Sequence, residues 1–111
     1  MARGEATFQA NGQAWILRFS NNAICKAEEE FKQPFGEIVA GLGGSGFRFQ
    51  TFRTLFRLGL SHHHMAATDD LAGDLIDEIG MTEALRITVE SIKAAMPAAK
   101  AAGAGEEPAA T

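Results

Sequence analysis

Three consecutive histidines, His62, His63 and His64, are the densest group of potential metal ligands in this chain of 111 residues. Imidazole is the commonest protein ligand for zinc, copper and nickel. Adjacent side chains on an ordered backbone rarely converge on one ion, however, and Asp69 and Asp70 would complete a site only if the loop folded back. The spacing therefore favours a solvated loop between helices, and we expect neither a metal nor a cofactor.

A second candidate, for a nucleotide-binding site, is a glycine-rich segment. Gly41, Gly43 and Gly46 match G-x-G-x-x-G, the spacing that lets a backbone approach a dinucleotide pyrophosphate. That motif needs a buried parallel strand before it and a βαβ unit around it, whereas segment 35–40 is short and carries Glu37. No Lys-Ser or Lys-Thr pair follows the glycines, as a phosphate loop would require. We interpret the segment as a mobile glycine loop.

Catalytic groups are no better placed. Cys25 is the only cysteine, which excludes an intramolecular disulfide and a cysteine metal cluster. It lies early in a predicted helix, where a small buried side chain is a more ordinary interpretation than a nucleophile. The carboxylates have the spacing of exposed helix faces rather than of a convergent pair. They are Glu28, Glu29, Glu30, Asp69, Asp70, Asp74, Asp77 and Glu78. We predict that the protein is not an enzyme.

The remaining candidates point to protein binding. Arg48, Arg53 and Arg57 border an aromatic segment, but the chain has a net charge of −4, which disfavours binding to nucleic acid or anionic lipid. A basic strip that faces acidic helices, in this chain or in a partner, is the preferred interpretation. Eight phenylalanines in a small domain cannot all be hidden, so some should form an exposed patch. The candidate partner-binding residues are Trp15, Phe47, Arg48, Phe49, Arg53 and Arg57.

Burial in the core is the alternative for the aromatic members of this set. For Phe52 and Phe56 we expect burial. The composition, 46% hydrophobic and 22% charged, is that of a globular protein, and the length suits a single domain. We expect this domain over residues 1–96 and a disordered tail of Ala, Gly, Pro and Glu over 97–111. A polar start and the lack of a long apolar run predict a cytosolic protein.

The elements that must position these residues begin with a β-hairpin over 6–19. Asn11 and Gly12 supply the two positive φ angles of a type I′ turn between alternating segments. On the second strand the large side chains share one face, and they are Trp15, Leu17 and Phe19. A lone hairpin is only marginally stable, so helices must cover that face.

Helical spacing and end signals predict helices over about 21–33, 36–42, 48–60, 68–79 and 82–96. Ser20 and Thr68 are N-cap candidates, and Gly80 is placed to end the fourth helix. One face of the third helix should hold Phe49, Phe52, Leu55, Phe56, Gly59 and Leu60. The buried stripe of the last helix should hold Leu85, Val89, Ile92 and Met96. The expected fold is α+β, mostly α, with the hairpin packed on four to five short helices.

The order of several motifs resembles a known family. The motifs are Leu17-Arg18-Phe19, then Asn22-Ala23-Ile24-Cys25 followed by Glu28-Glu29, the arginine and Gly-Leu helix from Phe52 to Leu60, the three histidines, and the acidic helix from Asp69 to Asp77 ending at Gly80. In this order they resemble the small tail proteins of phages and gene transfer agents, described as tail tube proteins or as tail assembly chaperones. The likeness covers about Phe8 to Met96.

The resemblance implies a role in tail morphogenesis and no catalytic residues. A tail assembly chaperone would keep the long helical tape measure protein soluble in the bacterial cytosol until tube subunits polymerise around it. Tube subunits are usually built around a substantial β-sheet, and this sequence shows one hairpin, which favours the chaperone. The alternatives left open are a structural tail tube or minor tail subunit located in the tail itself, a homo-oligomer paired through the hairpin edge, and a small metal-binding regulator that uses His62–His64.

Overall fold

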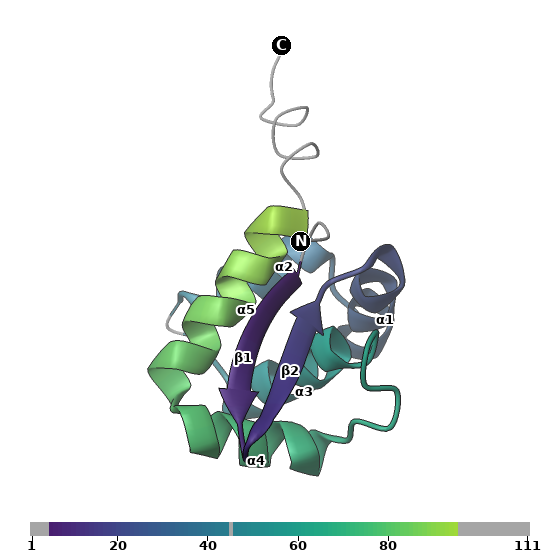
Figure 1. Cartoon of the computed structure of the whole chain (residues 1–111). Coiled ribbons are helices and arrows are strands. Elements are labelled where there is room, and N and C mark those ends of the chain that lie inside the picture. Colours follow the sequence, from purple (N-terminus) through teal and green to yellow (C-terminus); the bar gives the residue numbers. More distant parts are fainter. Residues whose placement is uncertain (1–4, 45, 96–111) are drawn as a thin grey trace.

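The computed structural model describes residues 5–44 and 46–95. Within these ranges a two-stranded antiparallel sheet precedes five helices, which confirms the predicted α+β, mostly α, class (Figure 1). The predicted tail over 97–111 and the predicted core residue Met96 lie outside the described residues. None of the helices in the described ranges combines the length and the apolar character that a bilayer span needs.

The hairpin consists of β1 (Glu5–Ala10) and β2 (Gln13–Arg18). Asn11 and Gly12 have φ angles of 55° and 73°, as the predicted turn requires. This two-residue turn sets the register, in which Phe8 lies opposite Trp15 and Ala6 opposite Leu17. One face of the hairpin is therefore apolar and buried. Its residues are Ala6, Phe8, Ala10, Trp15 and Leu17, with Phe19 just beyond β2.

Helices cover this face, as the instability of a lone hairpin demands. The helices are α1 (Asn21–Phe31), α2 (Phe35–Leu42), α3 (Phe49–Leu60), α4 (Asp69–Ile79) and α5 (Met81–Ala95). In Figure 1 the hairpin lies across α3, and α5 runs alongside β1. The hairpin and α3 together form the centre of the core.

Local signals explain most helix boundaries. The Ser20 hydroxyl accepts the Ala23 N–H at the start of α1, and the Thr68 hydroxyl accepts the Leu71 N–H at the start of α4. Gly80, with a φ angle of 92°, donates its N–H to the Ile76 carbonyl and ends α4. The predicted boundaries agree with the observed ones to within about two residues, the usual uncertainty at frayed helix ends.

The third helix fits the predicted face at every position except the first. Phe52, Leu55, Phe56 and Leu60 are buried, and the Phe56 ring lies 5.7 Å from that of Phe8. The side chain of Phe49 is instead 67% exposed, so its predicted place on the buried face is wrong. None of the elements packed on α3 in the described part of the chain covers its first turn well enough to bury this ring.

Gly59 lies inside α3 at a point where the helix packs closely against the hairpin. A Cβ atom there would lie 2.8 Å from Leu17 Cδ1 and 2.8 Å from Phe19 Cζ. Both of those side chains are themselves buried, so neither can move aside without repacking the core. The close approach of α3 to β2 therefore requires glycine at this position.

The buried face of α5 differs from the predicted stripe. Leu85 and Val89 are only half-buried. The residues that face the core are Ala84, Ile87, Thr88, Ser91 and Ile92. Thr88 Oγ1 donates to the Ala84 carbonyl at 2.8 Å, and Ser91 Oγ donates to the Leu17 carbonyl of β2 at 3.4 Å. Small and hydroxyl residues let α5 approach the hairpin closely, and a pattern that counts only large apolar side chains misses this face.

Candidate protein-binding surface

An aromatic patch forms at the start of α3 from Phe47, Arg48 and Phe49. The Phe49 ring is largely exposed and packs edge-to-face on Phe47, with 5.3 Å between ring centroids. Phe47 is half-buried and lies 6.1 Å from the buried ring of Phe52. The core thus holds Phe47 in place, and Phe47 in turn supports Phe49. The patch presents a large aromatic side chain to solvent on a rigid base.

The aromatic patch adjoins an open groove. The groove has a volume of about 370 Å³ and lies between α1, α2 and the start of α3. Its lining is mixed. The apolar side chains are Phe31, Ile38 and Leu42, and the polar and charged ones are Glu30, Gln33, Glu37, Arg48 and Thr51. Arg48 belongs to both the patch and the groove lining, so the two form one continuous surface. This surface can receive an amphipathic segment of another protein.

The charge at this end of α3 is positive. Arg48 occupies the N-cap position without a side-chain hydrogen bond to the helix, and the first turn holds no acidic residue. The first N–H groups of a helix carry partial positive charge, which an acidic cap would otherwise offset. Arg48 and the start of α3 therefore favour a partner that brings carboxylates close to its apolar side chains.

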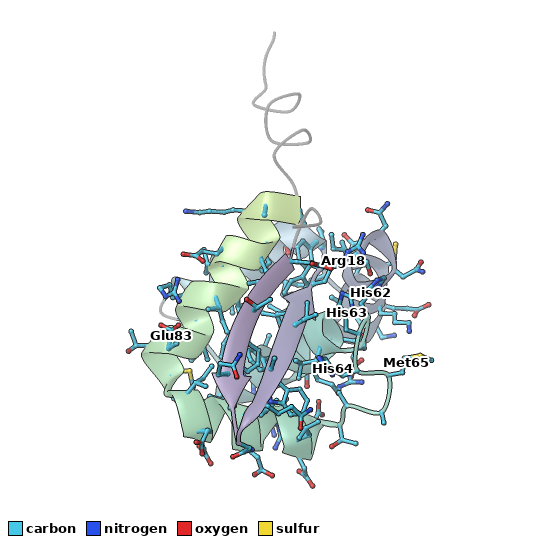
Figure 2. All side chains as sticks on the ribbon, viewed as in Figure 1. Arg18, His62, His63, His64, Met65 and Glu83 are labelled. Atoms are coloured by element: carbon cyan, nitrogen blue, oxygen red, sulfur yellow. The ribbon has the colours of Figure 1, made fainter. Side chains whose placement is uncertain are left out.

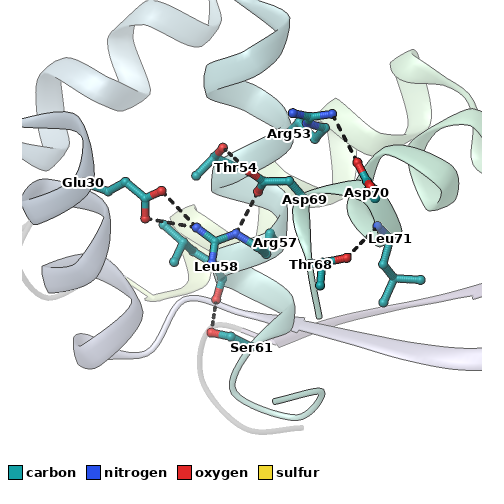
Figure 3. Close-up of polar contacts among 10 residues, drawn as sticks. All are labelled: Glu30, Arg53, Thr54, Arg57, Leu58, Ser61, Thr68, Asp69, Asp70 and Leu71. Carbon is teal, nitrogen blue, oxygen red and sulfur yellow. Dashed lines mark hydrogen bonds and ion pairs between the residues drawn. The ribbon is translucent and has the colours of Figure 1, made fainter. Parts of the chain in front are cut away.

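Arg57 belongs to a hydrogen-bond network within the chain rather than to the aromatic patch (Figure 3). Its Nε donates to Asp69 Oδ1 at 2.8 Å, and its Nη2 donates to Glu30 Oε1 at 3.0 Å. Thr54 Oγ1 completes the cluster with a contact of 3.4 Å to Asp69 Oδ2. These bonds join α1, α3 and α4, so Arg57 faces acidic helices of its own chain and we remove it from the candidate surface.

Arg53 is engaged more loosely. Its Nη1 lies 3.9 Å from Asp70 Oδ1, at the limit of an ion pair, and 40% of the Arg53 side chain is exposed. Asp70 is almost fully exposed, so this pair contributes little to stability. Arg53 stays a candidate because its side chain is partly exposed, although its Nε atom is buried against α4.

Trp15 does not lie on any binding surface. Only 8% of this residue is exposed, and its Nε1 donates to the Ala10 carbonyl at 3.0 Å. The sequence analysis grouped Trp15 with the aromatic residues of a partner-binding surface and left core burial as the alternative. The register turns Trp15 to the face that the helices cover, and we correct the prediction accordingly.

The three histidines contact the hairpin at three different points. Figure 2 shows them along the β2 side of the hairpin, with His62 beside Arg18. Arg18 Nη1 donates to His62 Nε2 at 3.1 Å, and His63 Nε2 lies 2.8 Å from Glu5 Oε2. The Ile16 N–H donates to His64 Nε2 at 3.2 Å, and the His64 ring stacks obliquely on Trp15 at 4.8 Å.

These contacts do not form a metal site. The three Nε2 atoms contact different hairpin residues, although the His62 and His63 rings pack edge-to-face at 4.8 Å. The part of the chain that the structure describes holds no group of three His, Cys, Asp or Glu side chains that could hold an ion. Burial and the neighbouring His63 lower the pKa of His64. These contacts join residues that are 44 to 58 positions apart in the chain, so no local sequence pattern predicts them.

The other sequence candidates lie apart from this surface. Cys25 is exposed on α1, so the expectation that it is buried is wrong. Gly41 lies within helix α2, and Gly43 and Gly46 follow that helix rather than a strand; the sheet found among the described residues is antiparallel. The βαβ setting of a dinucleotide fingerprint is thus lacking around these glycines.

An ion-pair cluster on α5 was also not among the features predicted from the sequence. Arg86 hydrogen-bonds to Glu83 and, at 2.8 Å, to Glu90, three and four residues away on an exposed face. The hydrogen bond from Arg86 lowers the pKa of Glu83, and the same bond raises the pKa of Arg86. This spacing could have been read from the sequence, and it is typical of a solvated helix face.

Comparison of the chain with protein-family models, with curated proteins and with solved structures gives no significant match. The features that bear on function are therefore the aromatic patch, its groove and the order of the sequence motifs.

Proposed function

We propose that the protein is a non-enzymatic tail assembly chaperone of the phage and gene transfer agent type, acting in the bacterial cytosol. It binds an apolar stretch of the helical tape measure protein through the aromatic patch and the adjoining groove. The observation that carries this proposal is the exposed ring of Phe49, which rests on Phe47 beside a groove lined by both polar and apolar side chains. An exposed aromatic ring on a rigid base beside a groove of mixed polarity favours a protein partner.

The chemistry of the surface defines the segment that it fits. An amphipathic helix would place apolar side chains three and four residues apart over Phe49 and into the groove. Carboxylates on its flank would meet Arg48 and Arg53, which add specificity and speed association more than they add affinity. The order of the sequence motifs supports the assignment of this partner to a phage-like tail.

The small sheet supports the chaperone over the tube subunit. Between residues 5 and 95, leaving aside position 45, the structure holds two strands, and helices cover one face of them. A tube wall usually needs a larger sheet that continues from one subunit to the next. The described part of the chain therefore offers more helix surface for a partner than sheet for polymerisation.

Co-expression with the long helical protein of the same gene cluster tests the proposal. Affinity capture followed by size-exclusion chromatography with light scattering should give a soluble complex with several copies per partner. Phe49→Ser should reduce the captured partner at least tenfold, which corresponds to about 1.4 kcal/mol. Circular dichroism should show that this variant keeps the wild-type fold.

Met65→Ser is the matched control. Met65 is the other large apolar side chain exposed in the described ranges, at 88%, and it follows the far end of α3. The helix between them is about 17 Å long, so a partner seated on the patch should not contact Met65. Equal losses in both variants would contradict the patch, and assembly of the protein alone into rings or tubes at high concentration would favour the tube subunit.

A further inference from the structure

The segment 61–68, which we call the histidine segment, lies along the outer edge of β2 (Figure 2). In an antiparallel hairpin with a two-residue turn, the pairs Ala10–Gln13, Phe8–Trp15 and Ala6–Leu17 exchange backbone hydrogen bonds. The residues between them on β2 direct their N–H groups away from β1. Ile16 is one of these residues, and His64 Nε2 accepts its N–H. The imidazole thus takes the position that a carbonyl of a third strand would occupy.

Two of the histidine contacts require a neutral ring. His64 Nε2 accepts a hydrogen bond from the Ile16 N–H, so its lone pair must be free and the ring proton must reside on Nδ1. Arg18 has donors only, so His62 Nε2 must also be an acceptor. Protonation of His64 would place two N–H donors against each other at Ile16. A protonated His62 would be a cation facing the Arg18 cation.

The third contact responds in the opposite way. His63 Nε2 is 2.8 Å from the Glu5 carboxylate, so a proton on His63 strengthens this contact. The charged and titratable groups that face the histidines are Glu5 of β1, Arg18 of β2 and Lys26 of α1, which lines a shallow pocket with His62. Asp69 and Asp70 at the start of α4 are paired with Arg57 and Arg53. Of these groups, Glu5 is the carboxylate that contacts the histidine segment, and it contacts His63.

We propose that the histidine segment is a proton-released cover of the β2 edge, closed while the His64 ring is neutral and detached when that ring is protonated. When closed, it occupies the N–H of Ile16 and prevents an extended chain from adding to β2. When detached, it opens the outward N–H and C=O groups of β2 to solvent. The lowered pKa of His64 agrees with a segment that stays closed at neutral pH.

Amide exchange of the full chain between pH 7.5 and pH 5 tests this proposal. Rates are measured by NMR and divided by the intrinsic rate at each pH. The protection of the Ile16 amide should fall at least tenfold as the pH drops, whereas the amides of Trp15 and Leu17, which bond to β1, should keep their protection. In His64→Gln the side-chain oxygen can still accept the Ile16 N–H but does not titrate, so protection should no longer depend on pH.

His63→Gln is the matched control, because His63 does not contact Ile16. This variant should still lose Ile16 protection as the pH falls, with the midpoint shifted upward because His63 no longer lowers the pKa of His64. The proposal is overturned if Ile16 is equally protected at both pH values, or if His63→Gln abolishes the response as His64→Gln does. It is also overturned if Trp15 and Leu17 lose protection together with Ile16, because the whole hairpin would then be opening.

Discussion

The two ends of α3 differ in what their side chains do. At the C-terminal end Phe56 and Leu60 are buried, and Gly59 lets the helix approach Leu17 of β2. At the N-terminal end Phe49 is largely exposed, although it lies on the same helical face as Phe52 and Phe56. The hydrophobic pattern is continuous along the helix. Whether a neighbouring element covers it determines which end stabilises the fold and which is left for a partner.

The largest expected effect contrasts two phenylalanines. Phe56→Ala should lower the free energy of unfolding by about 3–5 kcal/mol, because it leaves a cavity among buried rings. Phe49→Ala should change it by no more than about 0.5 kcal/mol, because the ring is exposed. Urea denaturation of both variants measures the difference. Similar losses in the two variants would show that the N-terminal end of α3 is covered in solution.

A smaller effect concerns the glycines. Gly59→Ala should lower the free energy of unfolding by about 1–3 kcal/mol, despite the higher helix propensity of alanine, because the new Cβ overlaps Leu17 and Phe19. Gly41→Ala in α2 should raise it by about 0.5–1 kcal/mol, since no atom lies within 4 Å of the new Cβ. Thermal and urea unfolding should give opposite signs for the two variants. A stabilised Gly59→Ala variant would mean that the contact between α3 and β2 is looser than described.

The smallest effect concerns the cap of α3. Arg48→Ser should raise the free energy of unfolding by about 0.5–1 kcal/mol, because Ser can accept an N–H of the first turn. Thr68→Ala should lower it by about 1 kcal/mol, because α4 loses the cap that it has.

If Arg48 serves the partner, capture of the partner by Arg48→Ser should weaken while the domain becomes more stable. A variant that gains stability and still captures the partner fully would separate Arg48 from the binding surface.

Much of the fold follows from signals only a few residues apart. Asn11 and Gly12 specify the turn, alternation specifies the face of the hairpin, and Ser20 and Thr68 specify helix starts. These signals act through backbone geometry and local hydrogen bonds. Composition also marked the aromatic segment at 47–49 as a candidate surface, but the helical pattern placed Phe49 on the buried face; in the structure Phe49 is exposed and Phe47 is half-buried.

Other features depend on contacts between distant residues. The core face of α5 includes Thr88 and Ser91, whose hydroxyls bond to carbonyls, and a hydrophobicity pattern does not identify such positions. Arg57 lies between two helices whose acidic residues are 27 and 12 positions away in the chain. Sequence spacing identifies the charged residues, but it does not predict which of them form ion pairs.

The sequence alone therefore determined the hairpin, the helices and their caps, because each depends on a few neighbouring residues and on steric limits of the backbone. Only the tertiary structure decided that Trp15 is buried, that Phe49 is exposed and that the histidines cover the edge of β2. These outcomes depend on how far each helix extends over its neighbours. That extent arises from packing among elements distant in the chain.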